Sequence, residues 1–485
     1  MYSVNQWIDY DGPPGFDYFT HVLQLLPDLH EQGSVLFVET LALAGFFMQN
    51  LNRRDAASLY IGSALRMAIT LGLHQEPPSS GLDEDTKEHR RRVWWSVYSL
   101  DRIHGVKSGN PITIHDEDIG VELPSRLSHE PGFCPAVVLR HYTKLSQISG
   151  QIMTSIYCYK PKSGPNIMAA VQNIILALSR WQQELPDQLR FEPIKLSTSR
   201  ESVSTLLYYS QCIHMTARPL LFHVVQARLK GGLADKESDW REGLTKITIN
   251  VIDMCVFAAK DTINMMTIAA QKNLVATYGY MDSDYAFSAA IVLVMVCLAF
   301  PTNEQNNESM NAALELLRGI AHRGNNYLAA RYRLLAHLRA TFVPSYGPGL
   351  PISGFDVPFP SDRMASNVQC LPKATPNDAQ PSPQALCSSL LEPAIPLSGT
   401  VPDHSNPAQP PPDLFDFTLL NNPSLADGIF YDVDMTGIHS GDNQEFWEEA
   451  FANSAGDSGN NLVESLEWGQ AALDHFGDGV NGIEQ

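Results

Sequence analysis

The chain lacks any cysteine spacing typical of a bound zinc ion. Its seven cysteines stand at positions 134, 158, 212, 255, 297, 370 and 387, so the closest two are 17 residues apart. Cysteines of zinc sites usually come in pairs about two to four residues apart, and the sequence therefore predicts no metal site. A scattered, odd set of thiols is typical of a reducing, intracellular compartment.

Positive charge is also scarce, and its distribution is uneven. The 485 residues carry a net charge of −20. Residues 341–485 hold 20 acids and two bases (Arg363 and Lys373), whereas residues 1–340 hold 33 acids and 31 bases. Because binding to nucleic acid needs a basic face, this composition argues against direct DNA contact by these residues. The asymmetry predicts a folded body followed by an interaction tail.

Strong alternation of apolar and polar residues, which would indicate β-strands, is missing throughout. Helical spacing recurs instead over residues 35–51, 55–72, 90–108, 136–158, 166–185, 201–230, 241–277, 284–300 and 308–340. We expect Asp55 to cap the second of these helices and Gly72 to end it. The sequence thus predicts an all-α body over residues 1–340.

Long apolar runs are nearly absent. One stretch without charge covers residues 285–303, but its apolar part stops at Pro301 after about 16 residues. A membrane-spanning helix needs about 20 apolar residues. We therefore expect a buried core helix here and no membrane partner.

The last third of the chain has the composition of a disordered region. Residues 341–430 contain 17 of the 32 prolines, and neither Lys nor Arg occurs after Lys373. Such a segment buries too little apolar area to offset the entropy lost on ordering. We predict a proline-rich disordered linker over residues 341–412 and an acidic-aromatic segment over residues 413–485.

Aromatic residues in that last segment are surrounded by acids. The clusters include DLFDFTLL (413–420), EFWEEAF (445–451) and ESLEWGQAALDHF (464–476). This interleaving is typical of activation segments, in which aromatic anchors enter a groove on a coactivator. We predict Phe415, Phe417, Trp447 and Trp468 as the anchors. The alternative is a solubilising tail with incidental aromatic residues.

Residues 90–124 combine a basic run, two tryptophans and a late group of acids: RRRVWWSVYSLDRIHGVKSGNPITIHDEDIGVELP. We expect the tryptophans to pack in the core, where each buries on the order of 200 Å². Our hypothesis is that Arg91 and Arg92 pair with Asp116 and Asp118 and hold residues 112–124 over the helix. The alternatives are a solvated basic helix start with an acidic loop, and a nuclear-import patch.

This stretch resembles the signature of the fungal-specific transcription factor domain, the regulatory middle region of zinc binuclear cluster regulators. Two further stretches are similar to that family, YIGSALRMAITLGLHQE (60–76) and MTARPLLFH (215–223), so that the resemblance covers about residues 30–230. The positions that carry the signature are Arg91, Arg92, Trp94, Trp95, Asp101, Arg102, Gly109, Pro111, Asp116, Asp118, Leu123 and Pro124.

The resemblance implies a nuclear transcription regulator, and the acidic-aromatic tail favours an activator. Its tail would recruit a coactivator or the general transcription machinery, while the helical body senses a signal or forms a homo- or heterodimer. Regulators of this family typically open with six cysteines that bind two zinc ions, but the first cysteine here is Cys134. Zinc as a cofactor, and direct DNA contact, are thus expected only through an N-terminal cluster preceding these residues. DNA contact could otherwise come from another protein.

Two other classes of protein stay open. An all-α module that binds a ligand or a partner would share the helical pattern and need no DNA contact of its own. A metal-dependent all-α enzyme, such as a terpene synthase, would use the acids of HDEDIGVE (115–122) to bind magnesium. The sequence has no second set of magnesium ligands, and we predict no catalytic residue and no enzyme.

Overall fold

We describe the protein from a computed structural model. The residues described are 15–26, 33–77, 81–157, 164–191, 198–230, 241, 244–299 and 303–342. The predicted linker, apart from residues 341 and 342, and the acidic-aromatic segment lie outside these ranges, as do all four predicted anchors.

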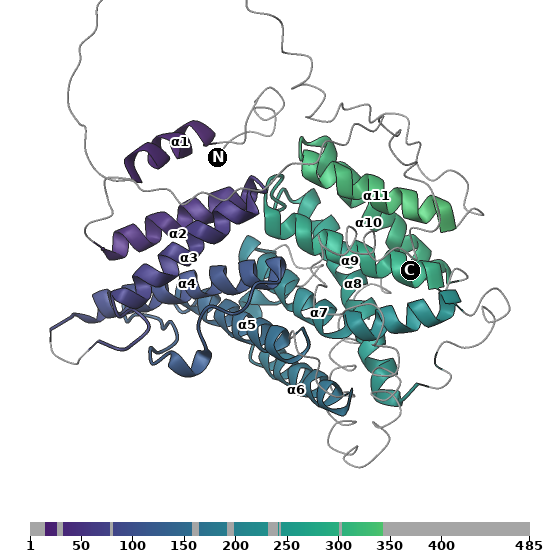
Figure 1. Ribbon diagram of the computed structural model, residues 1–485, viewed down its shortest axis with the longest axis horizontal. Helices are drawn as coiled ribbons and strands as arrows, with labels where there is room; N and C mark the ends of the chain where they lie inside the picture. The colour runs from purple at the N-terminus through teal and green to yellow at the C-terminus, as the bar shows by residue number, and fades with distance from the viewer. Residues whose placement is uncertain are drawn as a thin grey trace, which may run out of the picture. The chain divides into compact units, whose positions relative to one another are not determined.

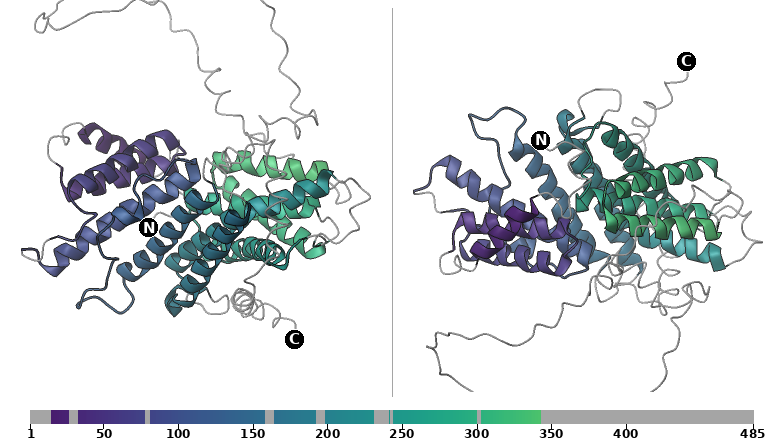
Figure 2. Two further views of the ribbon diagram at one scale, coloured as in Figure 1. Left: turned by 60° about the horizontal axis from the view of Figure 1, so that its bottom comes forward. Right: turned by 90° about the horizontal axis from the view of Figure 1, so that it is seen from above.

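The described part of the chain is all-α, as the sequence predicted. Its isolated β-bridge joins Gln75 to Gly120, and the described residues form no named strand. The elements are α1 (Phe16–Leu25), α2 (Val35–Asn50), α3 (Arg54–Thr70), α4 (Glu84–Ser108), η3 (Asp116–Asp118), α5 (Pro135–Ser155), α6 (Gly164–Gln183), η4 (Asp187–Leu189), α7 (Arg200–Lys230), α8 (Lys246–Gln271), α9 (Tyr280–Ala299), α10 (Glu304–His322) and α11 (Asn326–Phe342). Neighbours in this order pack on one another through much of the chain (Figures 1 and 2).

The starts of α3 and α4 differ from the predicted ones. Asp55 does not cap α3, because the helix starts one residue earlier, with Arg53 at the cap and Asp55 in the first turn. There its negative charge still interacts favourably with the positive, N-terminal end of the helix dipole. Helix α4 begins at Glu84, earlier than the apolar pattern indicated, because the Asp83 side chain accepts a hydrogen bond from the backbone of Thr86 at 2.8 Å.

The predicted helix over residues 308–340 is two helices. The chain turns at Gly324, whose φ of 104° lies in the region that favours glycine. Gly72 follows α3 with a φ of 68°, as expected for a glycine that ends a helix.

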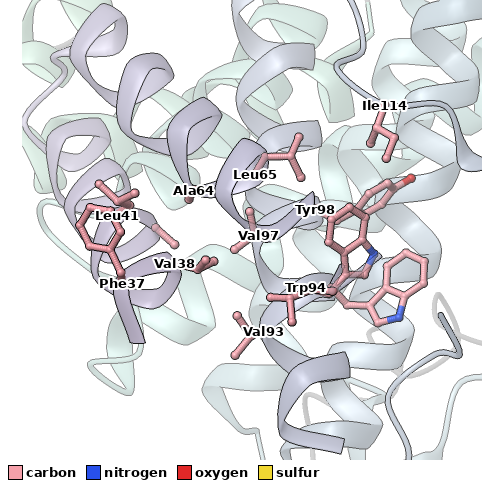
Figure 3. Packing of buried hydrophobic residues seen from close by; sticks show 14 of the residues in the cluster. Phe37, Val38, Leu41, Ala64, Leu65, Val93, Trp94, Val97, Tyr98 and Ile114 are labelled. Atoms are coloured by element: carbon pink, nitrogen blue, oxygen red, sulfur yellow. The ribbon is translucent and has the colours of Figure 1, made fainter. Parts of the chain in front are cut away.

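The first core lies among α2, α3 and α4 (Figure 3). Trp94 is fully buried there, and the rings of Trp95 and Tyr98 meet edge to face at 5.1 Å. Helices α2 and α3 approach closely because Gly45 has no side chain. A Cβ at that position would lie 2.6 Å from the Ile61 side chain. Both tryptophans thus occupy the core positions predicted from the sequence.

The second half of the body packs around α9, which contacts α7, α8, α10 and α11. Within the described residues, its stretch Tyr280–Cys297 is the one helical segment long and apolar enough to cross a membrane. Inside the protein, 89% of that stretch is buried. The apolar run therefore serves as the core helix that its length predicted.

Candidate functional site: the charged clamp on α4

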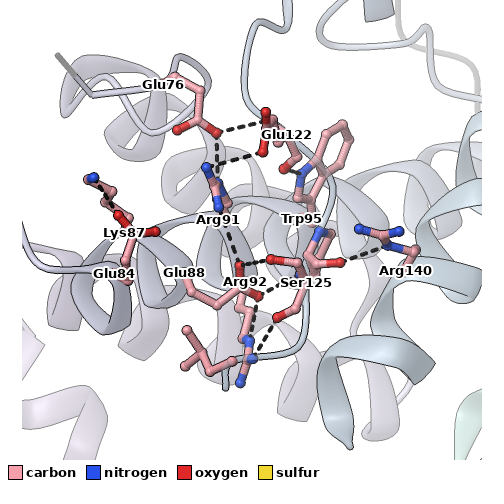
Figure 4. A network of polar contacts seen from close by, with 12 residues as sticks. Glu76, Glu84, Lys87, Glu88, Arg91, Arg92, Trp95, Glu122, Ser125 and Arg140 are labelled. Carbon is pink, nitrogen blue, oxygen red and sulfur yellow. Dashed lines mark hydrogen bonds and ion pairs between the residues drawn. The ribbon is translucent and has the colours of Figure 1, made fainter. Parts of the chain in front are cut away.

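Arg92 on α4 holds the segment that follows the Gly-Asn-Pro break (Figure 4). We call residues 112–130 the clamp segment. The Arg92 guanidinium donates two parallel hydrogen bonds to the carboxylate of Glu130, at 2.8 and 2.7 Å, and a third to the Ser125 carbonyl at 3.0 Å. Bidentate pairs of this kind are among the stronger polar contacts in proteins. Arg92 in turn lowers the pKa of Glu130 to about 2.

Glu88 connects the clamp segment to α4 from inside the protein. Its side chain is only 1% exposed, and its two oxygens accept hydrogen bonds from the Ser125 amide (2.9 Å) and hydroxyl (3.1 Å). The Arg92 Nε also donates to Glu88, at 2.8 Å. A buried carboxylate is costly unless it is paired and hydrogen-bonded, and here both conditions are met.

Arg91 makes a second set of contacts one residue earlier. Its Nε donates to the Glu76 carboxylate at 2.7 Å, and its terminal nitrogen lies 3.3 Å from Glu122. The same Glu76 oxygen accepts from the Glu122 amide at 2.9 Å. The hydrogen bond from Arg91 is the main cause of a lowered pKa of Glu76. Arg91 thus joins the loop after α3 to the clamp segment.

These contacts correct the predicted pairing of Arg91 and Arg92. A clamp does hold the segment to the helix, but the carboxylates that bind the two arginines are Glu76, Glu88, Glu122 and Glu130. Asp118 contributes its backbone carbonyl, which accepts from the Gln75 side chain at 3.0 Å. The short helix η3 turns this region, so that sequence order alone did not reveal which acids approach the arginines.

Asp116 pairs instead with a third arginine of the signature. Its Oδ1 accepts from the Arg102 guanidinium at 2.9 Å and from the Tyr98 hydroxyl at 2.6 Å. Arg102 is 2% exposed, also donates to the Ile114 carbonyl, and lies 4.6 Å from the Tyr98 ring centroid. A guanidinium of this kind suits a buried ion pair because its planar fork satisfies several acceptors at once.

The other signature positions complete the attachment. The indole N–H of Trp95 donates to the Glu122 carbonyl at 2.7 Å, and Arg140 of α5 donates to the Pro124 carbonyl at 2.8 Å. Asp101 accepts from the Thr113 hydroxyl at 3.0 Å. Gly109 ends α4 with a φ of 65°, and exposed Pro111 follows in the turn toward the clamp segment.

Glu76, Glu88 and Glu130 are clamp residues that the sequence reasoning missed. Glu88 had a readable signal, because an acid four residues before a base on a helix forms a favourable pair. Glu130 has no such signal, since it lies 38 residues from Arg92 and approaches only through the path of the clamp segment.

The Arg-Pro stretch on α7 has its own local chemistry. Pro219 lies inside the helix and lacks the N–H that would bond to the carbonyl of Met215. The Tyr157 hydroxyl donates to that carbonyl at 2.7 Å. The preceding Arg218 is 4% exposed and donates to the Ser288 hydroxyl of α9. Burial lowers the pKa of Arg218.

Metal-ligand geometry is not found in the part of the chain that the structure describes. No group of three or more His, Cys, Asp or Glu among these residues is placed to hold a metal ion. The described cysteines are free and buried, at positions 134, 212, 255 and 297. They lie on separate elements and do not fit a zinc cluster. Two of the four acids of the magnesium hypothesis, Asp116 and Glu122, are engaged with Arg102 and Arg91.

The fold and the clamp define an all-helical domain whose signature residues attach a long return segment to one helix. Residues 25–183 match the family model described as the fungal specific transcription factor domain. The match covers about a third of the chain, and the resemblance predicted from the sequence is confirmed. The clamp lies within the matched residues, whereas Arg218 and Pro219 lie beyond them.

Curated relatives are fungal transcriptional regulators. An uncharacterized transcriptional regulatory protein of Schizosaccharomyces pombe is 26% identical over 301 residues, which are 60% of this chain and 36% of that protein. The thiamine repressible genes regulatory protein of the same yeast is 24% identical over 282 residues (57% and 35%). Activator of stress genes 1 of Saccharomyces cerevisiae is 26% identical over 210 residues (40% and 22%).

The chain spans about a third of the length of the first two of these relatives. No solved structure matches it. The names of the relatives indicate regulators rather than enzymes.

Proposed function

We propose that this chain regulates transcription by RNA polymerase II in a fungal nucleus and that it acts as an activator. The family resemblance favours a metabolic or secondary-metabolite pathway. The observation that carries the proposal is the fungal specific transcription factor domain at residues 25–183, in the same chain as an acidic-aromatic segment at residues 413–485. The named relatives support the same class of protein.

The mechanism we propose is recruitment. Acids keep the aromatic side chains of the tail accessible to water, and a coactivator groove takes up Phe415, Phe417, Trp447 and Trp468. The helical body responds to a signal or to a dimer partner. DNA contact comes from a partner protein or from an N-terminal zinc cluster of the kind that the family resemblance implies, because the residues of this chain form no basic stripe.

The test is a tethering experiment. The full chain is fused to an unrelated DNA-binding domain, and transcription of a reporter is compared with that of the DNA-binding domain alone. We expect activation by the fusion and loss of activation when the four aromatic anchors are replaced by alanine. A matched variant with four polar tail residues replaced by alanine should keep its activity (Gln380, Ser382, Gln384 and Thr400).

Two outcomes would contradict the proposal. Reporter transcription no higher with the fusion than with the DNA-binding domain alone would argue against activation. Full activity of the variant without aromatic anchors would argue against recruitment through them. Because both arms use one reporter and immunoblots give the amount of each fusion, poor expression can be told from lost activity.

A further inference from the structure

A cavity lies where α2 and α4 meet the α9–α11 part of the body. Its volume is about 330 Å³ including the open mouth. Every lining residue has a polar side chain: Gln49, Asn50, Asn52, Lys107, Tyr278, Tyr280, Ser283, Asn325 and Tyr327. Carbon atoms form more of this wall than polar atoms do, and its amide, hydroxyl and ammonium groups are the ones that can orient a small polar ligand.

Gln49 offers this cavity a hydrogen-bond donor that the protein does not use. The side chain is 1% exposed, and its Oε1 lies 3.0 Å from Nδ1 of His104. Burial lowers the pKa of His104 to about 4 and so keeps the ring neutral; in the tautomer with its hydrogen on Nδ1, the ring donates to that oxygen. The Gln49 Nε2 is buried and has no hydrogen-bond partner. A buried amide left in this state is costly, and a ligand that accepts from it removes the cost.

Lys107 brings positive charge to the same wall. Its side chain is 13% exposed, and its ammonium group contacts the Asp284 carboxylate and lies 4.8 Å from the Tyr280 ring centroid. Asp284 also accepts from Arg331 at 2.6 Å, so two cations share one carboxylate. Burial lowers the pKa of Lys107, and nearby Arg331 and Arg54 lower it further, while Asp284 acts in the opposite direction. The positive charge around the cavity favours an anion.

We propose that this cavity binds a small oxyanion, a phosphate or a short carboxylate, through the Gln49 amide and the Lys107 ammonium. A bound cation would meet Lys107, and an apolar ligand would leave the Gln49 donor unsatisfied. Gln49, Asn52 and Lys107 belong to the matched family domain, whereas the lining from Tyr278 to Tyr327 lies beyond it. The oxyanion therefore joins the two halves of the body. Only its role as a regulatory signal rests on the proposed function.

The test measures binding to the full chain directly. Sodium phosphate or sodium acetate is titrated into the protein, and sodium chloride at equal ionic strength is the control. Calorimetry and thermal unfolding are the readouts. We expect saturable heat and a saturable rise in melting temperature with at least one oxyanion. Binding of phosphate alone or of acetate alone identifies which of the two chemistries the cavity takes. An oxyanion response no larger than the chloride response overturns the proposal.

Two variants locate the site. Gln49→Glu replaces the unused donor by a negative charge, and Asn52→Asp adds the same charge at an exposed lining residue. Asn52 has a φ of 57°, which Asp tolerates about as well as Asn, so this variant should fold normally. Each variant should raise the dissociation constant about tenfold or more, as expected for a lost charge-assisted contact.

Gln151→Glu is the matched control, because it makes the same chemical change at an exposed position on α5. It should bind the oxyanion as the wild type does. Unchanged binding in Asn52→Asp, or equal weakening in Gln151→Glu, would overturn the assignment to this cavity. None of these measurements depends on transcription, so the site and the proposed function fail independently.

Discussion

Arg92 and Glu130 lie 38 residues apart in the chain and form a bidentate ion pair at 2.7 and 2.8 Å. Buried Glu88 joins the same group through the Arg92 Nε and the backbone of Ser125. Together these contacts fasten the clamp segment to α4. The basic run before the two tryptophans is thus structural, because its cations hold the chain that returns across the helix.

Gly150 on α5 makes room for Arg102, and we predict that Gly150→Ala destabilises the body. A Cβ at this position would lie 3.1 Å from the Arg102 Nε, so the guanidinium must shift by a few tenths of an ångström, which strains its hydrogen bonds to Asp116 and Ile114. We expect a loss of about 1–3 kcal/mol in the free energy of unfolding, measured by urea denaturation. The control is Gly62→Ala on α3, where nothing lies within 4 Å of the added Cβ. It should gain up to about 1 kcal/mol, and equal stability of both variants would contradict the packing described.

Tyr157 compensates for the proline inside α7. We predict that Tyr157→Phe lowers the free energy of unfolding by about 1 kcal/mol, because the Met215 carbonyl loses its hydrogen bond. In a Pro219→Ala background the helix regains an N–H for that carbonyl. The same tyrosine change should then cost less than half as much in a double-mutant cycle followed by denaturation. An equal cost in both backgrounds would show that Tyr157 acts in some other way.

Two buried histidines should make the protein less stable as the solution becomes acidic. Burial lowers the pKa of His104 to about 4 and that of His214 to about 3, from an ordinary value of 6.5. The unfolded chain therefore takes up protons first, and stability is lost as the pH falls from 6.5 toward 4. For His214 the loss at pH 5 is about 2 kcal/mol relative to neutral pH.

The corresponding variant is His214→Gln, studied by urea denaturation at a series of pH values. Its free energy of unfolding should fall less steeply between pH 6.5 and pH 4 than that of the wild type, whatever its value at neutral pH. His115→Gln changes an exposed ring and should leave the slope as it is. An unaltered slope in His214→Gln would mean that this histidine is not held neutral by the fold.

The sequence predicted the helices well where apolar residues recur with helical spacing, as in α2 and α3. It missed the turn at Gly324 because the apolar pattern continues through it. The tryptophan pair was placed in the core on size and spacing alone, and both residues are buried there. These features depend on neighbours within one or two helical turns.

The partners of the arginines could not be predicted in the same way. Asp116 and Asp118 are nearer in sequence to Arg92 than Glu130 is, yet η3 turns this stretch and Asp116 binds Arg102 instead. Which of several acids meets a given arginine depends on the path of a segment with little regular structure. Composition showed that acids and bases were present in this stretch, and only the fold showed how they pair.

The most direct test of the clamp is a double-mutant cycle on Arg92 and Glu130. Arg92→Met alone should lower the free energy of unfolding by on the order of 2 kcal/mol, because Glu88 is left buried with fewer partners. Arg92→Met and Glu130→Gln, measured singly and together by urea denaturation, should cost clearly less together than the sum of their separate costs. The same cycle with Asp118→Asn in place of Glu130→Gln should be additive. Additive losses for Arg92 and Glu130, or coupling only between Arg92 and Asp118, would contradict the clamp described here.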